Sequence, residues 1–484
     1  MDARMGTDVL APAMFVSLVI ALIAGFPVAF SIAAVAAAFG VVGVLSGHFT
    51  PQFLLNMPLR LEGFFHNDNL LTIPLFLFMG MLLERTQIAE DMLHALDRLF
   101  GRIRGGMAYT VVLVGATIAA MTGFVSASVI AIGLIALPAM LRKGYDRRLA
   151  TGVIAASGTL AQILPPSIVL IVLAEQLDVS LIDIYSGALL PSALLVCLYL
   201  LYIFLVTRWK PHFAPAGPPA AELTRKKDAI WIEAAIAAGF PIGLILAVLA
   251  SIYFGVVTPI EGGAVGVCGV LLLGLLRGKL NLRNLRQATD ATGILCSCVL
   301  FLLFGASFFM LVFRGLDGHV WIESLFQHLP AGQIGFLVFI NVAIFFLAFF
   351  LDFFEIAFIV LPLIVPVAHK LNIDMTWFAV LIAVNLQTSF MHPPFGIALY
   401  NLRSIAPASV RTPQIYWGAV PFLLIQLLMV GILMAIPGIV SWTLAQPMAP
   451  EDIQMQLPPG DYTDRAQPSS VAPVDSEPAT LQGK

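Results

Sequence analysis

Four short polar segments interrupt an otherwise apolar chain, and their residue types suit the binding of a small cation and a carboxylate. Two lie in the first half, Thr122-Gly-Phe-Val-Ser-Ala-Ser128 and Ile163-Leu-Pro-Pro-Ser-Ile168. Two lie in the second half, Asp352-Phe-Phe-Glu355 and Met391-His-Pro-Pro-Phe-Gly396. A Pro-Pro step removes backbone donors, so carbonyl oxygens in the preceding turn are freed. With nearby hydroxyls and amides they can replace the water around a cation, while a half-helix N-terminus in the same cavity attracts a carboxylate.

The composition places these segments inside a membrane. Hydrophobic residues make up 60% of the 484 residues and charged residues 11%, against about 45–50% and about 25% in soluble domains. The mean hydropathy is +0.95, and apolar runs long enough to cross a hydrocarbon core of about 30 Å recur along the chain. The net charge is −3 without a basic tract, which excludes a nucleic-acid partner. The sequence therefore predicts an all-α polytopic protein in a lipid bilayer.

Ordinary spans and two irregular blocks alternate along the chain. We expect spans at 10–26, 28–46, 69–84, 150–174, 184–206, 231–253, 258–276, 288–313, 377–402 and 414–443, with amphipathic stretches at 85–105 and 314–332. The blocks at 107–140 and 333–368 exceed one span but fall short of two spans and a turn. A bare turn facing lipid would leave backbone groups unpaired. Both blocks are therefore predicted to be re-entrant hairpins with tips buried in protein or lining a watery cavity.

The distribution of basic residues predicts the orientation. The loops 85–106, 141–149, 207–230, 277–287 and 403–413 together hold 19 of the 25 Lys and Arg, and the opposite side holds six. Because short cytoplasmic loops are rich in these residues, we expect the first set of loops on the cytoplasmic side of a bacterial inner membrane. Both termini are then periplasmic.

The two halves carry the same elements in the same order. Each has two spans, a third span with an amphipathic arm, a hairpin, a broken span and a final span. The interval from hairpin centre to Pro-Pro is 39 residues in one half (Ser126 to Pro165) and 41 in the other (Asp352 to Pro393). Since the hairpins open to opposite sides, the repeat is inverted, an arrangement typical of secondary transporters with sites at the repeat interface.

This order predicts a division of the chain into scaffold and transport parts. The predicted parts are 1–106 (scaffold spans and first arm), 107–175 (first transport hairpin and broken helix), 176–332 (scaffold spans, cytoplasmic linker 207–230 and second arm), 333–402 (second transport hairpin and broken helix), 403–445 (final scaffold span) and 446–484 (a disordered periplasmic tail, rich in Pro, Ser and Asp).

Five motifs together resemble the large permease subunit of tripartite ATP-independent periplasmic (TRAP) transporters. They are Asn69-Leu-Leu-Thr-Ile-Pro-Leu-Phe76, Gly144-Tyr-Asp146, Ala155-Ala-Ser-Gly-Thr-Leu160 before Pro165-Pro166, Thr258-Pro-Ile-Glu261, and the run from Asn385 to Gly396. The resemblance covers about residues 10–443. It implies a sodium-driven, elevator-type importer of small organic acids, with a periplasmic substrate-binding protein and a small membrane subunit as partners. It implies no cofactor besides sodium as the coupling ion.

Two segments depart from the commoner pattern of that family. Asp352 is followed by Phe353, Phe354 and Glu355 rather than by a proline and small residues, and the second broken helix has His392 before its prolines and Arg403 after them. These features resemble a branch described as handling 2-oxo acids or related carboxylates.

The first predicted ion site lies at the first hairpin and first Pro-Pro break. Ser126 and Ser128 are candidate ligands of sodium or substrate, or else caps of the half-helices. Before the prolines, the freed carbonyls would complete the site, although small residues there also suit helix packing. We expect the first sodium near Ser126, Ser128, Gly158 and Leu164, with Thr159, Gln162 and Pro166 beside it.

The second predicted ion site repeats this arrangement. We expect it near Asp352, Asn385, Thr388 and Met391, with Glu355, Ser389 and Pro394 beside it. Acids at bilayer depth are costly and mark function by default, but Asp352 and Glu355 could instead cap a hairpin arm. The polar residues before the prolines could also simply bond a neighbouring helix.

Charged residues outside the two ion sites receive separate interpretations. Arg314 and Arg403 are candidate contacts for a substrate carboxylate, or they extend to the membrane interface from span ends. We expect His392 to be a hydrogen-bonded histidine in a polar seam rather than a proton carrier. Glu261 forms a capping box with Thr258 and is expected to be structural.

Two other functions fit parts of the sequence. A stand-alone sodium- or proton-coupled dicarboxylate carrier would share the architecture but need no binding protein. An intramembrane enzyme would need Asp352, Glu355 and His392 to converge, and no nucleophile–base or metal-ligand spacing supports that. We therefore predict a transporter and no enzymatic activity.

Overall fold

The computed structural model describes residues 9–86, 88–101, 103–215, 227–327, 332–349, 351, 353–393 and 396–442. Within these residues the secondary structure is helical throughout. Eight of the described helices are long and apolar enough to cross a membrane, and several shorter apolar helices lie among them. The predicted all-α polytopic fold is confirmed. The predicted tail at 446–484 lies outside the described residues.

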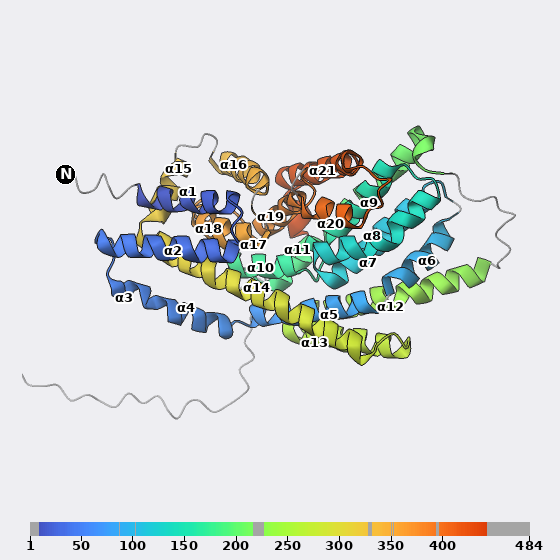
Figure 1. Ribbon diagram of the computed structural model, residues 1–484, viewed down its shortest axis with the longest axis horizontal. Coiled ribbons are helices and arrows are strands. Elements are labelled where there is room, and N and C mark those ends of the chain that lie inside the picture. The colour runs from blue at the N-terminus through green and yellow to red at the C-terminus, as the bar shows by residue number, and fades with distance from the viewer. Residues whose placement is uncertain are drawn as a thin grey trace, which may run out of the picture. The chain divides into compact units, whose positions relative to one another are not determined.

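The first half of the described chain runs from α1 to η2 (Figure 1). Its elements are α1 (Leu10–Ile23), α2 (Val28–Leu45), α3 (Pro51–Leu54), α4 (Asn56–Phe65), α5 (Asp68–Arg85), α6 (Ile88–Phe100), α7 (Gly106–Thr122), α8 (Val125–Arg142), α9 (Arg147–Thr159), η1 (Leu160–Gln162), α10 (Ile168–Leu177), α11 (Leu181–Trp209) and η2 (Pro211–Phe213).

The second half begins with α12 and repeats most of this order. Its elements are α12 (Lys227–Tyr253), α13 (Pro259–Leu276), α14 (Leu282–Gly315), α15 (Gly318–Gln327), α16 (Gly332–Leu347), α17 (Phe353–Glu355), the π-helical turn η4 (Ile356–Val360), α18 (Leu361–Lys370), α19 (Met375–Ser389), α20 (Ile397–Ile405), α21 (Thr412–Ala435) and α22 (Gly438–Ser441).

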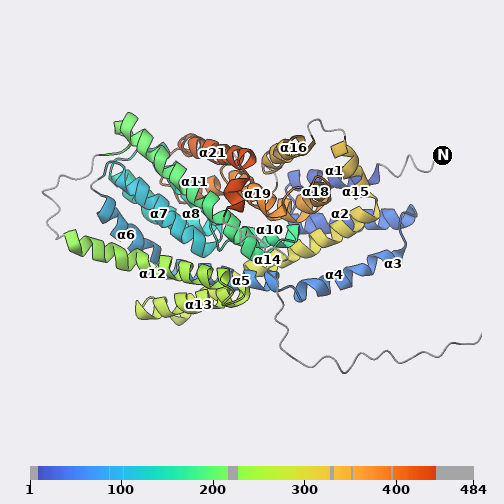
Figure 2. The same ribbon diagram turned by 180° about the vertical axis from the view of Figure 1, so that it is seen from behind.

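Both predicted hairpins are present. The first has arms α7 and α8, and the second has α16 as one arm and α17, η4 and α18 as the other. The two hairpins lie on opposite sides of α10 in both views (Figures 1 and 2). At the first tip, Gly123 has φ +59°, and a Cβ there would lie 3.3 Å from the backbone nitrogen of Ile168. The left-handed turn and this close approach to α10 both favour glycine.

Both predicted broken helices are present as well. The first is α9 and η1 followed, after the Pro-Pro step, by α10, and the second is α19 followed by α20. The predicted amphipathic arms appear as α6 and α15, and α5 and α6 meet at an angle of 62°. The inverted repeat thus pairs α1, α2, α5–α6, the first hairpin, α9–α10 and α11 with α12, α13, α14–α15, the second hairpin, α19–α20 and α21.

Two ion pairs occupy equivalent places in the repeats. Lys143, just after the first hairpin, lies 2.6 Å from Asp97 of α6. Lys370, at the end of the second hairpin, lies 2.6 Å from Glu323 of α15. Each hairpin is therefore linked to the arm helix of its own repeat. Since both lysines are exposed, each pair contributes at most about 1 kcal/mol.

The repeats interlock through crosswise packing. Helix α2 packs against α14, and α5 packs against α13. A close crossing joins α9 with α21, where a Cβ at Gly152 would meet the carbonyl oxygen of Gly418 and a Cβ at Gly418 would meet that of Arg148. Small residues let membrane helices approach at backbone distance. This crossing fixes α21 directly to the first broken helix.

Local capping explains where several helices begin. The Asp146 carboxylate accepts from the backbone nitrogen of Arg148 at 2.8 Å at the start of α9. The Asp374 carboxylate accepts from that of Trp377 at 2.7 Å at the start of α19. At α13, Thr258 and Glu261 form the predicted capping box, with Pro259 at the first helical position. The structural interpretation of Glu261 is confirmed.

The structure differs from the prediction at several places. Helices α3 and α4 occupy a stretch for which no element was predicted, and α4 is amphipathic rather than uniformly apolar. Helix α14 begins at Leu282 instead of 288, because Asn281 caps it with a 2.7 Å bond from the backbone nitrogen of Asn284. The expected linker at 207–230 is shortened, since α11 continues to Trp209 and η2 follows it.

We predict that Gly152→Ala or Gly418→Ala destabilises the protein by about 1–3 kcal/mol, because the added methyl group meets a backbone carbonyl that cannot move aside. The measurement is thermal unfolding in detergent. Gly431→Ala is the matched control, since this glycine lies on the same helix as Gly418 and a Cβ there would have no neighbour within 4 Å. Equal stability of Gly418→Ala and Gly431→Ala would contradict the close crossing.

Candidate functional site

All four interrupted elements contribute to one cavity, which we call the hairpin-tip cavity. Its volume is about 70 Å³. The first hairpin tip, the first broken helix, the second hairpin and the second broken helix each supply part of its wall. The lining residues are Gly123, Phe124, Val125, Ser126, Gln162, Ile168, Val169, Phe353, Phe354, Phe390 and Ile397. The sequence-predicted convergence of hairpins and broken helices is therefore present.

Three half-helices begin at this cavity. Val125 and Ser126 are the first residues of α8, Ile168 and Val169 of α10, and Ile397 of α20. Unpaired backbone N–H groups and the helix dipole make such N-termini favourable for anions. In α10, the backbone N–H of Val169 already donates to the Ser167 hydroxyl, at 3.2 Å. The cavity thus presents a positive potential made from backbone rather than from charged side chains.

Ser126 and Gln162 are the polar side chains among the described residues of the lining. Ser126 is partly exposed to the cavity. Gln162 is 1% exposed, and neither atom of its amide has a partner among the described residues. A buried amide without partners costs about 1–3 kcal/mol, so this side chain is suited to a ligand. Both residues belong to the predicted first site.

Two breaks regain some of the hydrogen bonds that their prolines remove. At the first, the Ser167 hydroxyl donates to the Gln162 carbonyl at 2.7 Å, and the Leu160 carbonyl accepts from Leu164 at 3.0 Å. At the second, the Phe390 carbonyl accepts from the backbone nitrogen of Ala398 at 3.2 Å. Other donors of the protein therefore bond these three carbonyls in place of the missing proline N–H groups, and fewer carbonyls stay free to bind a cation.

Ser128 and Gly158 lie beside the cavity rather than in its lining. Ser128 is fully buried, 2.6 Å from the Thr122 hydroxyl, and it donates to the Phe124 carbonyl at 3.0 Å. Its hydroxyl thus closes the turn between α7 and α8. Gly158 lies against α8, where a Cβ would be 3.0 Å from the backbone nitrogen of Val129. The Ser128 hydroxyl is thus used within the hairpin turn, Gly158 is used in close helix packing, and neither residue is in the described lining of the cavity.

Thr159 is the centre of a buried polar network that joins four helices. Its hydroxyl accepts from the amide of Gln387 at 3.3 Å and from that of Gln426 at 3.2 Å. Gln426 also donates to the Tyr199 hydroxyl at 2.9 Å. The network therefore links α9, α11, α19 and α21. Sequence analysis did not single out Gln387, Gln426 or Tyr199, although a glutamine inside an apolar span is itself a signal of helix–helix bonding.

The predicted second site is built on α19. Asn385 donates to the Asn341 carbonyl at 2.8 Å, joining the helix to the second hairpin. The hydroxyls of Thr388 and Ser389 donate to carbonyls of their own helix, Thr388 to that of Asn385 at 2.6 Å. A donating hydroxyl keeps its lone pairs, so its oxygen can still face a cation. Met391 is buried, with its backbone nitrogen 2.9 Å from the Thr388 carbonyl.

Two members of the predicted second site, Asp352 and Pro394, lie outside the described residues. Glu355 is 5% exposed at the start of the second arm, and it is not among the described residues that line the hairpin-tip cavity. In the first site, Leu164 is half-buried and Pro166 is buried at the break before α10.

His392 does not lie in a polar seam as expected. Its ring stacks on Phe349 at 4.5 Å and meets Phe345 edge-on at 4.2 Å. Neither ring nitrogen has a partner among the described residues, and the side chain is 1% exposed. Phe345 of α16 and Phe349, which follows that helix, supply these two ring contacts among the described residues.

The two candidate carboxylate contacts have different environments. Arg403 donates to the Val410 carbonyl at 2.6 Å, so its guanidinium holds the turn between α20 and α21. Arg314 instead lines a second cavity of about 370 Å³, together with Arg60 of α4 and Glu175 of α10, which we call the arginine cavity. The Glu175 carboxylate accepts from the Asn67 amide at 2.7 Å. Burial, and then the nearby Arg314 guanidinium, lower the pKa of Arg60.

An aromatic stack lies between the two cavities. Phe354 lines the hairpin-tip cavity, and Phe358 lines the arginine cavity. Their rings are stacked with centroids 6.1 Å apart. Both residues belong to the second arm of the second hairpin, Phe354 in α17 and Phe358 in the π-helical turn. The wall that separates the hairpin tips from the arginines is therefore part of a hairpin.

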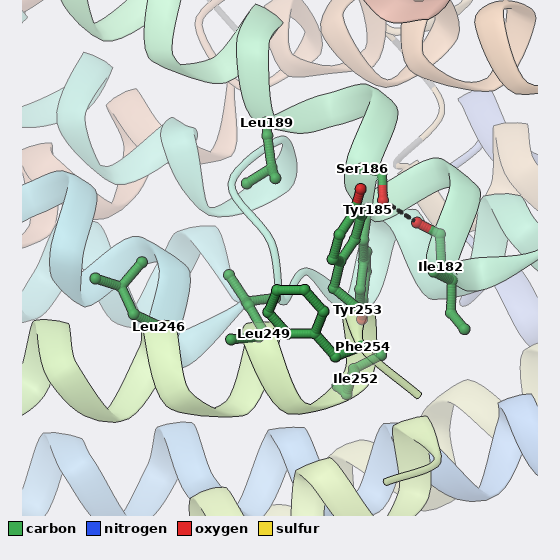
Figure 3. A pocket seen from close by; sticks show the side chains of 10 residues that line it. Ile182, Tyr185, Ser186, Leu189, Leu246, Leu249, Ile252, Tyr253 and Phe254 are labelled. Atoms are coloured by element: carbon green, nitrogen blue, oxygen red, sulfur yellow. Dashed lines mark hydrogen bonds between the residues drawn. The ribbon is translucent and has the colours of Figure 1, made fainter. Parts of the chain in front are cut away.

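A third pocket, of about 240 Å³, lies between α11 and α12 (Figure 3). Its walls are apolar side chains with two tyrosines, Tyr185 and Tyr253. The Ser186 hydroxyl at its edge donates a hydrogen bond to the Ile182 carbonyl at 2.8 Å (Figure 3). Its described lining holds no charged side chain, so we do not assign it to a carboxylate.

The paired hairpins, broken helices and enclosed cavity define a secondary transporter built as an inverted repeat. Residues 15–439 match the family described as "Tripartite ATP-independent periplasmic transporter, DctM component", and the chain belongs to this family.

Known relatives agree with that membership. The C4-dicarboxylate TRAP transporter large permease protein DctM of Pseudomonas aeruginosa is 27% identical over 396 residues, covering 81% of this chain and 90% of the relative. The sialic acid TRAP transporter permease protein SiaT of Haemophilus influenzae is 23% identical over 377 residues, covering 77% and 59%. The crystal structure of the Alcanivorax borkumensis YdaH transporter, described as having an unusual topology, shares the fold, with a TM-score of 0.55, 15% identity and 81% and 89% coverage.

We predict that Thr159→Val destabilises the protein by about 1–3 kcal/mol, because two buried glutamine amides lose their shared acceptor. Thermal unfolding in detergent measures the change. Thr117→Val is the control, since that hydroxyl bonds only the Leu113 carbonyl of its own helix, at 3.0 Å. If the two variants were equally stable, the network would have no role in joining the helices.

Proposed function

We propose that this chain is the permease through which a small organic acid enters the cell together with sodium. The observation that carries the proposal is the single cavity enclosed by both hairpins and both broken helices. In this proposal a periplasmic binding protein delivers the acid and a small membrane subunit braces the permease, as membership of the family implies. The relatives' names mention a C4-dicarboxylate and sialic acid, so they do not agree on one substrate.

The carboxylate of the substrate is assigned to the polar side of the hairpin-tip cavity. Ser126 and the Gln162 amide can donate to it, and the first turns of α8 and α10 supply backbone donors and dipole. A carboxylate bound there would satisfy the amide nitrogen of Gln162. Arg60 and Arg314, on the far side of the Phe354–Phe358 stack, are assigned the role of drawing anions toward the site.

Sodium is assigned to oxygen atoms of the hairpins and broken helices. The first ion is placed at the Ser126 hydroxyl and the carbonyls before the first Pro-Pro break. The second is assigned to Asn385, Thr388 and Met391, while Asp352, the acid predicted to join them, lies outside the described residues. Support comes from the hydroxyl of Thr388, whose proton is committed to the Asn385 carbonyl at 2.6 Å while its lone pairs are not. Unwound helices offer such oxygens to sodium in other secondary transporters.

We infer that α11 and α21 move with the hairpins and broken helices, although the sequence groups them with the scaffold. The backbone crossing of Gly152 and Gly418 and the bonds of Tyr199 and Gln426 to Thr159 support this grouping. In the orientation given by the basic loops, both termini are periplasmic, and the Arg60–Arg314 cavity faces the periplasm.

The test is uptake of a panel of radiolabelled organic acids into proteoliposomes that contain this chain and its small subunit. Uptake is measured under an inward sodium gradient, with and without the periplasmic binding protein. We expect uptake only when sodium and the binding protein are both present. Uptake without the binding protein would identify a stand-alone carrier instead, and uptake driven by a proton gradient alone would remove the sodium assignments.

We predict that Ser126→Ala raises the sodium concentration for half-maximal uptake about tenfold, which corresponds to about 1.4 kcal/mol for one lost ligand. The same proteoliposome assay measures it. Ser192→Ala is the matched control, because this buried hydroxyl donates within its own helix to the Leu189 carbonyl at 2.9 Å. An unchanged sodium dependence in Ser126→Ala would place the ion elsewhere.

A further inference from the structure

Phenylalanine rings form much of the wall of the hairpin-tip cavity. Phe124 comes from the first hairpin tip, Phe353 and Phe354 from the second hairpin, and Phe390 from the second break. Four aliphatic side chains, Val125, Ile168, Val169 and Ile397, complete it. Phe353 is 2% exposed and Phe390 8% exposed, so these rings belong to packed protein and have little freedom to turn away from a ligand.

Two polar side chains, Ser126 and Gln162, are present among the described residues of the lining. Ser126 belongs to α8, and Gln162 lies just before the first Pro-Pro step. The unpartnered Gln162 amide is an independent sign that a ligand binds here, because this side chain is 1% exposed, lines the cavity and has no hydrogen-bond partner among the described residues. None of the described lining residues carries a charge.

This distribution discriminates between the two ends of a bound acid. A carboxylate finds donors at Ser126, Gln162 and the helix N-termini. The rest of the molecule meets rings and alkyl groups, where an added hydroxyl would lose its water without a replacement. An alkyl chain meets no such cost and gains from leaving water. The volume of about 70 Å³ limits the length of the chain that fits.

We propose that the hairpin-tip cavity selects short monocarboxylates that carry an unsubstituted alkyl chain, with the chain held among Phe124, Phe353, Phe354 and Phe390. This rests on the proposed function in taking the cavity as the site of the transported acid. It adds the substrate class, and it makes the phenylalanines of the second hairpin residues that determine specificity.

Equilibrium binding separates this proposal from the transport cycle. The purified chain with its small subunit, in detergent and sodium, is titrated calorimetrically with acetate, propanoate, butanoate, pentanoate and hexanoate. We expect the dissociation constant to fall about fourfold for each added CH2, which corresponds to about 0.8 kcal/mol per buried CH2. The fall stops at the length where the cavity is full. Butanoate should bind at least tenfold more tightly than 4-hydroxybutanoate.

Variants assign the effect to this cavity. Phe354→Ala enlarges it and should move the stopping point to a longer acid, and Phe354→Leu should do the same to a smaller extent while preserving packing. Gln162→Leu should weaken all the acids equally and keep the fourfold step. Phe346→Ala is the matched control, because that ring is 61% exposed on the outer face of α16.

Several results would overturn the proposal. They are equal binding across the series, equal binding of butanoate and 4-hydroxybutanoate, or stopping points that are the same in both Phe354 variants and in Phe346→Ala. The proposed function can fail separately. If the series binds as expected but a sodium gradient drives no uptake, the substrate class stands and the coupling does not. If sodium-driven uptake occurs without the chain-length dependence of binding, the reverse holds.

Discussion

Backbone N–H and C=O groups buried in a membrane must be hydrogen-bonded, and this requirement governs the places where helices of this protein are interrupted. The hydrocarbon interior offers no water to a peptide group left unpaired. The chain nevertheless interrupts four elements near their middle, and it replaces some of the lost bonds at specific positions. The Ser167 hydroxyl donates to the Gln162 carbonyl, and the backbone nitrogen of Ala398 donates to the Phe390 carbonyl. The hydroxyls of Thr122 and Ser128 bond to each other across the first hairpin turn. Interruptions of this kind are stable only where other helices surround them, so the four converge on one cavity.

Much of the fold could be predicted from the sequence because span length and proline chemistry are local. The hairpins, the Pro-Pro breaks and the Thr258–Glu261 box each follow from a few adjacent residues. Helix α4 was missed because its amphipathic pattern lacks the apolar length that identifies a span. The Thr159, Gln387, Gln426 and Tyr199 network was missed because its members come from four helices, and no local pattern shows which faces will meet.

The site was predictable as a region but not atom by atom. Ser126 and Ser128 are two residues apart, yet one lines the cavity and the other bonds inside the hairpin. Because both serines lie on α8, two positions apart, they point to nearly opposite faces of the helix, and the sequence does not reveal which face meets the cavity. Arg403 and Arg314 differ similarly, since a carbonyl seven residues away captures the first while the second reaches a cavity. His392 shows the opposite effect, because neighbouring aromatic rings excluded the polar surroundings expected for it.

The glycine crossing of α9 and α21 restricts the mechanics of the whole molecule. Where two helices touch through their backbones, neither can slide past the other without first separating. Any sliding of one part of this chain past another must therefore occur elsewhere. The arginine cavity lies away from this crossing, where α4 and α14 meet α10 and the π-helical turn. In the movement proposed above, an anion bound between Arg60 and Arg314 would touch helices on both sides of this cavity and so would resist their separation.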